Sequence, residues 1–282
     1  MNELSLIIFS ILLQSAVGFS IMFFLYRRTI LADVKGDFLT WTMFGIAATA
    51  AVGLLISSTH MNYPLNAPYA LTNFWTSWLS REAIFAPAFI GLVGILFLMS
   101  WSKRVINSHI LGIAAVAGAF DVFCLANIYR SSSILTWSTN YSIALHVGGM
   151  LLLGSLVAIV YLSRLSQTQS KVITQLLLMI LVIMVIRAIT QVDLLTNLDV
   201  RQAAQGLMFP WDSVSAFYHY FPILLAGWIF GIVGAVLIVF YLIHDGYPRT
   251  KKTFFSPVLV AIIGMVTLYE LLCRVHFYLF NI

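Results

Sequence analysis

Eight long apolar stretches dominate this chain, and each is long enough to cross a lipid bilayer. A transmembrane helix needs about 20 apolar residues to span roughly 30 Å of hydrocarbon. Of the 282 residues, 61% are hydrophobic and 9% are charged, whereas soluble domains contain roughly 45–50% and about 25%. The stretches cover Leu4–Leu25, Phe38–Ile56, Ala83–Met99, His109–Tyr129, Ser142–Leu162, Val172–Val192, Tyr220–Ile243 and Pro257–Tyr278. They lack the period-two alternation of barrel strands. The sequence therefore predicts an all-α integral membrane protein with eight transmembrane helices.

The whole chain, residues 1–282, is predicted to form one polytopic membrane domain. Glu3 stands where a cleavable signal peptide carries basic residues, and Arg27 and Arg28 follow the first apolar stretch directly. We therefore expect the first helix to stay in the membrane. Two connections are long enough to form surfaces outside the bilayer, an amphipathic loop at about 61–81 and a second loop at about 193–219.

Basic residues fall mostly in the connections after the first, third, fifth and seventh helices. They are Arg27, Arg28 and Lys35, then Lys103 and Arg104, then Arg164 and Lys171, then Arg249, Lys251 and Lys252. Cytoplasmic loops carry an excess of Lys and Arg, so these connections are predicted to lie inside and both termini outside. The net charge of +5 is explained by this orientation and needs no nucleic acid partner.

His60 and Glu82 are predicted to lie at the facing outer ends of the second and third helices. Ionisable residues within a membrane are costly and usually functional, so this pair indicates proton chemistry on a hydrophobic redox or proton-carrying ligand. We place Glu82 in the first turn of its helix, where the helix dipole favours the carboxylate. Trp78 lies in a stretch with helical spacing of apolar residues, typical of an interfacial helix. That helix either simply anchors the chain at the membrane surface or forms the entrance through which a lipid-soluble ligand reaches the site.

Four more charged residues are placed inside predicted helices: Asp121, Arg187, Glu270 and Arg274. Each costs about 2.5–3.5 kcal/mol at the bilayer centre, so such residues pair with one another or line a functional cavity. Glu270 and Arg274 stand four residues apart and can pair on one helix face. We interpret Asp121 and Arg187 as partners across helices. A structural role and a role as proton relay both stay open for these charges.

The histidines and cysteines do not predict a redox centre. A chain of two haems across the bilayer needs histidine pairs at two depths, and His146 and His219 could form at most one outer pair. The remaining intramembrane histidines are interpreted as hydrogen-bonded packing residues: His109, His244 and His276. Two separate cysteines are too few for a cluster. We expect no haem, no iron–sulfur cluster and no metal in this chain, so electrons would need a redox partner.

The stretch from His60 to Glu82 resembles the signature of the dimethyl sulfoxide reductase membrane anchor subunits. It contains Pro64, Ala67, Leu71 and Asn73 at the matching places. Tyr129 followed by Trp137 resembles the family's fourth connection, and Tyr269–Arg274 is similar to its closing helix. The resemblance covers essentially the whole chain, with eight spans and external termini.

This resemblance implies a subunit that binds menaquinol, holds no haem and passes electrons to an iron–sulfur subunit in anaerobic respiration. That subunit feeds a molybdopterin catalytic subunit which reduces sulfoxides or N-oxides. The chain would then oxidise quinol in the bacterial cytoplasmic (inner) membrane without acting on the terminal substrate. Both partner subunits are expected on the periplasmic face.

His60 and Glu82 match the family's quinol-site histidine and glutamate, and each would accept one proton. We expect Trp78 to help line the site. Arg81 either contacts the quinol or faces lipid phosphate or the partner protein. Asn62 and Asn66 stand where the family pattern has a glycine and an arginine. The entrance to the site and the preferred quinone are therefore expected to differ.

Two other functions fit parts of the pattern. A proton-coupled transporter would use the four intramembrane charges as substrate or relay residues. Transporters commonly show internal repeats with broken helices, and neither is evident in this sequence. A purely structural anchor would leave His60 and Glu82 as loop-capping residues.

Overall fold

The computed structural model of the chain describes residues 3–33, 36–59, 64–164, 170–205, 213–244 and 257–279. Eight helices in this part are long and apolar enough to cross a membrane. They are α1 (Glu3–Leu25), α3 (Asp37–Ser58), α4 (Trp78–Lys103), α5 (Ser108–Arg130), α6 (Asn140–Leu162), α7 (Ser170–Gln205), α9 (Phe221–His244) and α10 (Pro257–Leu279). The described residues form no strand. The predicted all-α membrane protein with eight spans is confirmed.

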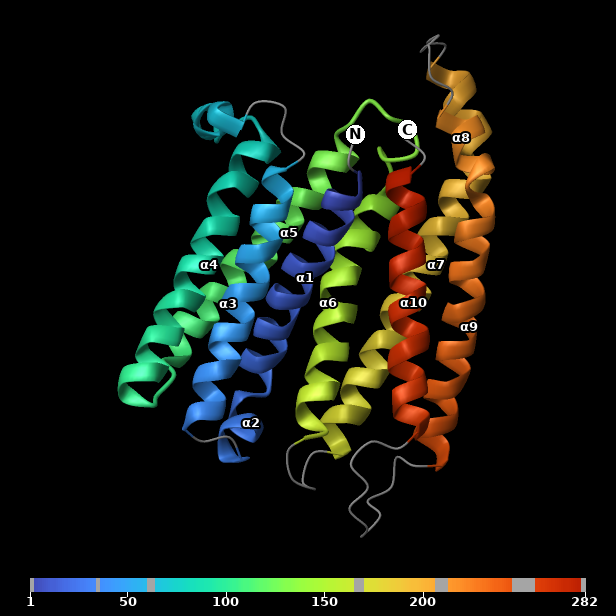
Figure 1. Cartoon of the computed structure of the whole chain (residues 1–282). Helices are drawn as coiled ribbons and strands as arrows, with labels where there is room; N and C mark the ends of the chain where they lie inside the picture. The colour runs from blue at the N-terminus through green and yellow to red at the C-terminus, as the bar shows by residue number, and fades with distance from the viewer. Residues whose placement is uncertain are drawn as a thin grey trace.

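Three short elements complete the described fold: α2 (Arg27–Asp33), the 3₁₀ helix η1 (Pro64–Asn73) and α8 (Ser213–His219). α1 begins and α10 ends at the same end of the bundle, which also carries η1 and α8 (Figure 1). We call this the η1 end and the opposite one the α2 end. The side of the membrane that each end faces stays a prediction.

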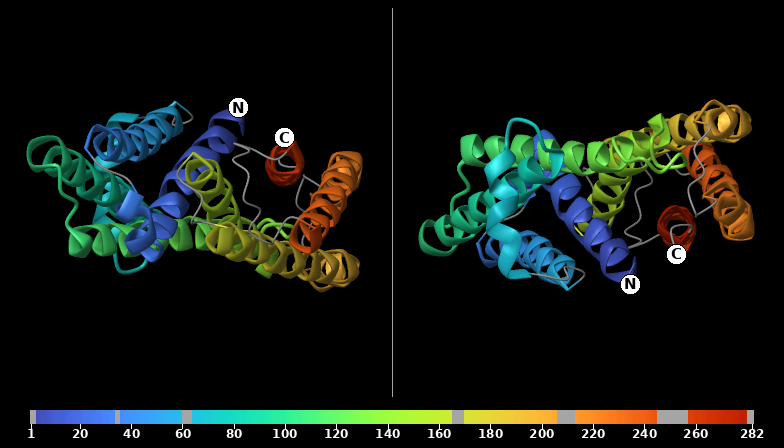
Figure 2. Two further views of the ribbon diagram at one scale, coloured as in Figure 1. Left: turned by 90° about the horizontal axis from the view of Figure 1, so that it is seen from below. Right: turned by 90° about the horizontal axis from the view of Figure 1, so that it is seen from above.

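The spans pack as two groups that meet at α6. α1 contacts α3, α5 and α6, and α4 lies against α3 and α5. α10 packs mainly on α9, while α7 contacts α6 and α9. Seen along the helix axes, the array is elongated, with α4 toward one extremity and α9 toward the other (Figure 2).

The backbones of α1 and α6 approach each other closely at Gly18 and Gly154. A Cβ atom added to Gly154 would lie 2.2 Å from the Gly18 carbonyl carbon, and one added to Gly18 would lie 1.9 Å from the Met150 carbonyl oxygen. Small residues allow transmembrane backbones to touch in this way, and close van der Waals packing holds helices together in lipid. This contact therefore fixes the crossing of α1 and α6, which together with the α5–α6 contact joins the first group of spans to α6.

We expect Gly154→Ala to separate α1 from α6 and to destabilise the fold by about 1–3 kcal/mol, as overpacking typically does. The thermal unfolding midpoint of the detergent-solubilised chain would report the change. Gly264→Ala is the matched control, because a Cβ atom there meets nothing within 4 Å. Equal midpoints for the two variants would contradict the tight crossing.

α7 is longer than the predicted sixth span, Val172–Val192. It continues to Gln205, so residues 193–205 form helix where the sequence analysis placed the start of an outer loop. Leu, Arg, Gln and Ala in this segment favour helix, and no glycine or proline interrupts it before Gly206. The prediction was wrong here because it used hydropathy to end a helix that polar residues can continue.

Candidate functional site

α4 begins at Trp78 because Ser77 caps it. The Ser77 backbone is extended, with φ −110° and ψ 126°, and its hydroxyl accepts a hydrogen bond from the Ser80 N–H at 3.3 Å. The helix thus starts five residues before the predicted third span, Ala83–Met99. Glu82 is therefore the fifth helical residue and lies beyond the first turn, within which the dipole effect is largely confined. The argument that the dipole favours the Glu82 anion was wrong.

Arg81 donates hydrogen bonds to the connection that precedes α4. Its Nε donates to the Phe74 carbonyl oxygen at 3.0 Å, and Nη2 donates to the Trp75 carbonyl oxygen at 2.6 Å. Its guanidinium carbon lies 4.2 Å from the centroid of the Trp78 ring. These contacts fasten the segment after η1 onto the first turns of α4.

Glu82 lies opposite Asp121 on the antiparallel helix α5. The rings of Trp78 and Phe123 have centroids 5.8 Å apart, and those of Phe85 and Phe120 lie 4.6 Å apart. These two contacts set the register of α4 against α5 on both sides of the carboxyl groups, which interact electrostatically with each other. The structure thus brings together two acidic residues that the sequence analysis had kept apart.

Asp121 is completely buried, and neither of its carboxyl oxygens has a hydrogen-bond partner among the described residues. Glu82 is only partly buried. An unsatisfied buried polar group costs about 1–3 kcal/mol, and an ionisable residue inside a membrane marks a functional site by default. We call Glu82 and Asp121, with the four rings beside them, the acid pair site.

His60 lies outside the described residues, so its predicted position beside Glu82 stays a prediction. The first three residues of the amphipathic loop at about 61–81 are also outside them, while η1 forms its middle. On the described part, Leu71 and Trp75 are exposed.

A second polar cluster lies in the interior, around Glu270. Its carboxylate accepts hydrogen bonds from the Arg187 guanidinium and from Arg274 Nε, the latter at 2.6 Å. Arg274 also donates to the Gln14 side-chain oxygen. All four side chains are buried. A Cβ atom on Gly149 would lie 2.2 Å from Arg274 Nη2. The absence of a side chain at this position of α6 therefore leaves space for the Arg274 guanidinium.

The cluster confirms one predicted pair and corrects another. Glu270 and Arg274 do pair on one face of α10. Arg187 pairs with Glu270 and not with Asp121, because α7 packs against α6 and α9, whereas Asp121 faces α4. We name the side chains of Gln14, Arg187, Glu270 and Arg274 the Glu270 cluster. It links α1, α7 and α10.

His146 uses both ring nitrogens within the protein. Nδ1 lies 2.8 Å from the Ser142 carbonyl oxygen, and Nε2 lies 3.2 Å from the Tyr278 hydroxyl. The ring also stacks on Tyr129 with centroids 5.0 Å apart. A haem iron would need one of these nitrogens. Within the described ranges, no three His, Cys, Asp or Glu side chains gather as metal ligands would.

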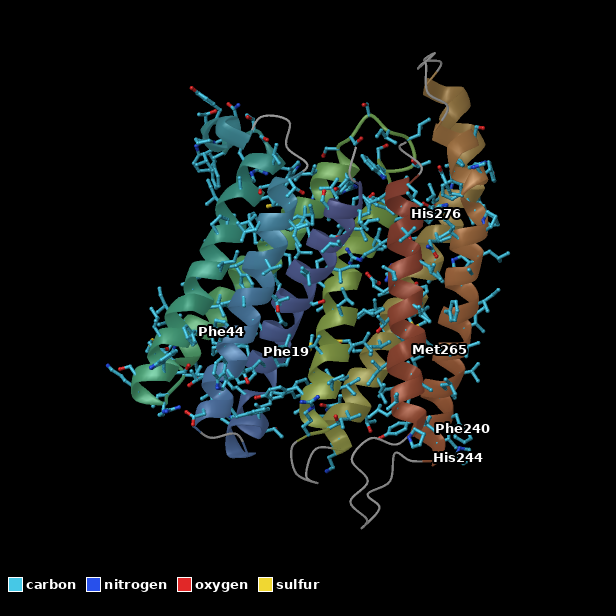
Figure 3. The ribbon with its side chains drawn as sticks, viewed as in Figure 1. Phe19, Phe44, Phe240, His244, Met265 and His276 are labelled. Carbon is cyan, nitrogen blue, oxygen red and sulfur yellow. The ribbon has the colours of Figure 1, made fainter. Side chains whose placement is uncertain are left out.

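Two histidines interpreted as packing residues lie at opposite ends of the second group of spans (Figure 3). His276 is buried, and its ring meets that of Phe217 edge-on at 4.6 Å. His244 stacks on Phe240 at 4.3 Å near the α2 end. His276 therefore packs inside the protein, whereas His244 is exposed and contacts Phe240 on its own helix.

The sequence analysis missed Gln191, which connects three helices. Its Nε2 donates to the Tyr141 hydroxyl at 2.7 Å, and its Oε1 accepts a hydrogen bond from Trp228 Nε1 at 2.7 Å. The available signal was an uncharged amide within an apolar span, since such groups must find partners in lipid. Gln14 is likewise an uncharged amide within an apolar span, in α1.

The fold and its polar groups define a polytopic helical membrane protein with an acid pair near one end. The family model "DMSO reductase anchor subunit (DmsC)" matches residues 1–279. The chain therefore belongs to the DMSO reductase anchor subunit family. Membership identifies it as a multi-pass membrane protein of the anchor subunit type.

One curated relative is similar to the chain, the C subunit of the anaerobic dimethyl sulfoxide reductase of Haemophilus influenzae. It is 28% identical over 160 residues, which cover 53% of this chain and 57% of the relative. The match thus spans little more than half of that relative's length. No solved structure matches the chain.

Proposed function

We propose that the chain oxidises menaquinol and passes the electrons to the iron–sulfur subunit of a molybdopterin oxidoreductase that reduces DMSO or N-oxides. The observation that most supports this function is the acid pair site, with Glu82 partly buried beside the fully buried Asp121. Proton-accepting groups between aromatic rings at a membrane end suit a lipid-soluble ligand that must lose hydrogen. The basic α2 end supports a periplasmic η1 end in a bacterial inner membrane.

The proposed reaction converts menaquinol to menaquinone with loss of two electrons and two protons. Both O–H bonds of the quinol break, and the Glu82 carboxylate takes one proton while His60 takes the other. The electrons leave one at a time to an iron–sulfur centre of the partner docked on the η1 end. Both protons then leave on that same side, so the step carries no charge across the membrane.

Trp78 and Arg81 would shape the site beside Glu82. The Trp78 ring contacts the Arg81 guanidinium, at 4.2 Å, and meets the Phe123 ring edge-on, at 5.8 Å. The two carbonyl contacts of Arg81 hold its guanidinium beside Trp78. We propose that Trp78 forms a wall for the quinol ring and that Arg81 is a positioning residue.

The function is tested with the intact complex in membranes, driven either by menaquinol or by an artificial donor that reduces the partner subunits directly. We expect both donors to support reduction of the terminal substrate, and a complex without this chain to keep only the artificial reaction. An intact complex that is active with the artificial donor but does not oxidise menaquinol would contradict the proposal.

The structure gives the transport hypothesis no specific support. Three of the four charges that it would use are tied together in the Glu270 cluster. Of these four charges, only Asp121 has no hydrogen-bond partner for its side chain among the described residues, and it lies beside Glu82.

We expect Asp121→Asn to slow menaquinol-driven turnover by about tenfold, equivalent to about 1.4 kcal/mol. The amide keeps the shape of the side chain but can no longer exchange a proton or interact as a charge with Glu82. The artificial-donor rate should stay unchanged. Asp193→Asn is the control, because Asp193 is exposed on α7. Equal menaquinol rates for the two variants would remove Asp121 from the site.

A further inference from the structure

A lipid-facing groove runs between α1 and α5 from the α2 end toward the middle of the membrane. The volume of this open groove is about 510 Å³. Its lining includes Phe24 and Arg27 on the α1 side and His109, Gly112, Val116 and Ala117 on α5. We call it the α1–α5 groove. Its mouth lies at the α2 end, and its inner end is lined by Phe85 of α4, one of the four rings of the acid pair site.

The groove has the length of one leaflet. Ser108 and Ala117 both line it, and the nine residue steps between them rise by about 14 Å along the helix. Half of the hydrocarbon core measures about 15 Å. The walls are apolar beyond the first turn of α5, and Val116 is 70% exposed. The groove therefore matches an acyl chain that lies along the protein within one leaflet.

Arg27 stands at the mouth of the groove in a fixed position. Its Nη1 donates to the Phe24 carbonyl oxygen at 2.8 Å, and the guanidinium carbon lies 4.5 Å from the centroid of the Phe24 ring. In the described part of the chain, no carboxylate forms an ion pair with it. The other guanidinium N–H groups can therefore reach an anion at the interface.

The surroundings of the mouth are basic. Arg28 and Lys103 lie at the same end of the bundle, and the carboxylate of Asp37 pairs with Arg104. Basic pockets between transmembrane helices bind anionic lipid headgroups, and each basic residue near the surface contributes about 1 kcal/mol. A phosphate group at Arg27 and His109, with its acyl tail beneath, satisfies both the charge and the apolar walls.

We propose that the α1–α5 groove is a binding site for one anionic phospholipid of the leaflet at the α2 end. The headgroup phosphate contacts Arg27 and His109, and one acyl chain lies against Phe24, Gly112 and Val116. This site does not depend on quinol chemistry. It would fix the α1–α5 contact, on which the acid pair site depends through α5.

The test titrates the delipidated full-length protein with phosphatidylglycerol or phosphatidylcholine and counts bound lipids by native mass spectrometry. We expect phosphatidylglycerol to bind more tightly, and Arg27→Gln to weaken its binding about fivefold. Arg28→Gln is the matched control, because it removes the same charge from the neighbouring residue, which does not line the groove. Equal losses in the two variants would show diffuse surface charge and overturn the proposal.

A second variant tests the apolar part of the groove. Val116→Trp fills it from an exposed position, so the protein core is not disturbed. We expect the same loss of phosphatidylglycerol binding with Arg27 intact. Val236→Trp on α9 is the control, since Val236 is 62% exposed and lies outside the groove. Unchanged binding in Val116→Trp, or competition by glycerol phosphate as strong as by the lipid, would refute an acyl-chain site.

Discussion

The Glu82→Gln complex is expected to lose menaquinol-driven turnover by about 100-fold or more, the usual contribution of a positioned acid–base group. Glutamine keeps the size of the side chain and its place opposite Asp121, but its amide cannot accept the quinol proton. The partner subunits are unaffected, so the rate with an artificial donor that reduces them directly should equal that of the parent complex. Anaerobic rates with both donors, measured on the same membrane preparation, give the ratio.

Two outcomes would count against Glu82 as the proton acceptor. An equal loss with both donors would indicate a failure of assembly, and an unchanged menaquinol rate would place the chemistry elsewhere. Asp37→Asn is the matched control, because it removes one carboxylate from the opposite end of the bundle, where Asp37 pairs with Arg104 on the surface. Surface ion pairs contribute about 0–1 kcal/mol, so this variant should retain both activities.

The fold could be predicted from the sequence because hydropathy decides it. An apolar stretch of about 20 residues is stable in lipid as a helix, because a helix pairs the backbone N–H and C=O groups by hydrogen bonds within the same segment. The ends of the helices were less predictable. The Ser77 hydroxyl caps α4, so this helix begins before its apolar stretch does. The polar, helix-favouring residues after Val192 extend α7 beyond the end of its apolar stretch. Both effects are independent of hydropathy.

The site was predicted only in part, for a related reason. Glu82 stood out as a carboxyl group at a membrane end, but its neighbour depends on which helices pack together and in which register. Charge complementarity alone suggested Arg187 as the partner of Asp121. The ring contacts between α4 and α5 instead place Asp121 opposite Glu82, and α10 supplies the carboxylate for Arg187. A pairing rule for charges cannot distinguish these arrangements without the helix contacts.

Glu270→Gln is expected to be the most destabilising substitution in the Glu270 cluster, by about 3–5 kcal/mol. Glu270 is the one carboxylate found between two buried guanidinium groups in the described interior. Its removal leaves two unpaired cations in the membrane, whereas Arg187→Met leaves the neutral pair of Glu270 and Arg274. We expect the latter variant to lose only about 1–2 kcal/mol, within the common range for single substitutions. The order of the two effects follows from the net charge that remains.

The measurement is the amount of folded protein in the membrane, together with the thermal unfolding midpoint in detergent. Glu270→Gln should lower both strongly and reduce the menaquinol and artificial-donor activities of the complex in equal proportion, unlike Glu82→Gln. A selective loss of the menaquinol rate, with normal amounts of folded protein, would show that Glu270 takes part in the chemistry. A midpoint for Arg187→Met at or below that of Glu270→Gln would contradict the charge argument, because the deletion of one cation would then be as harmful as the deletion of the anion that both cations share.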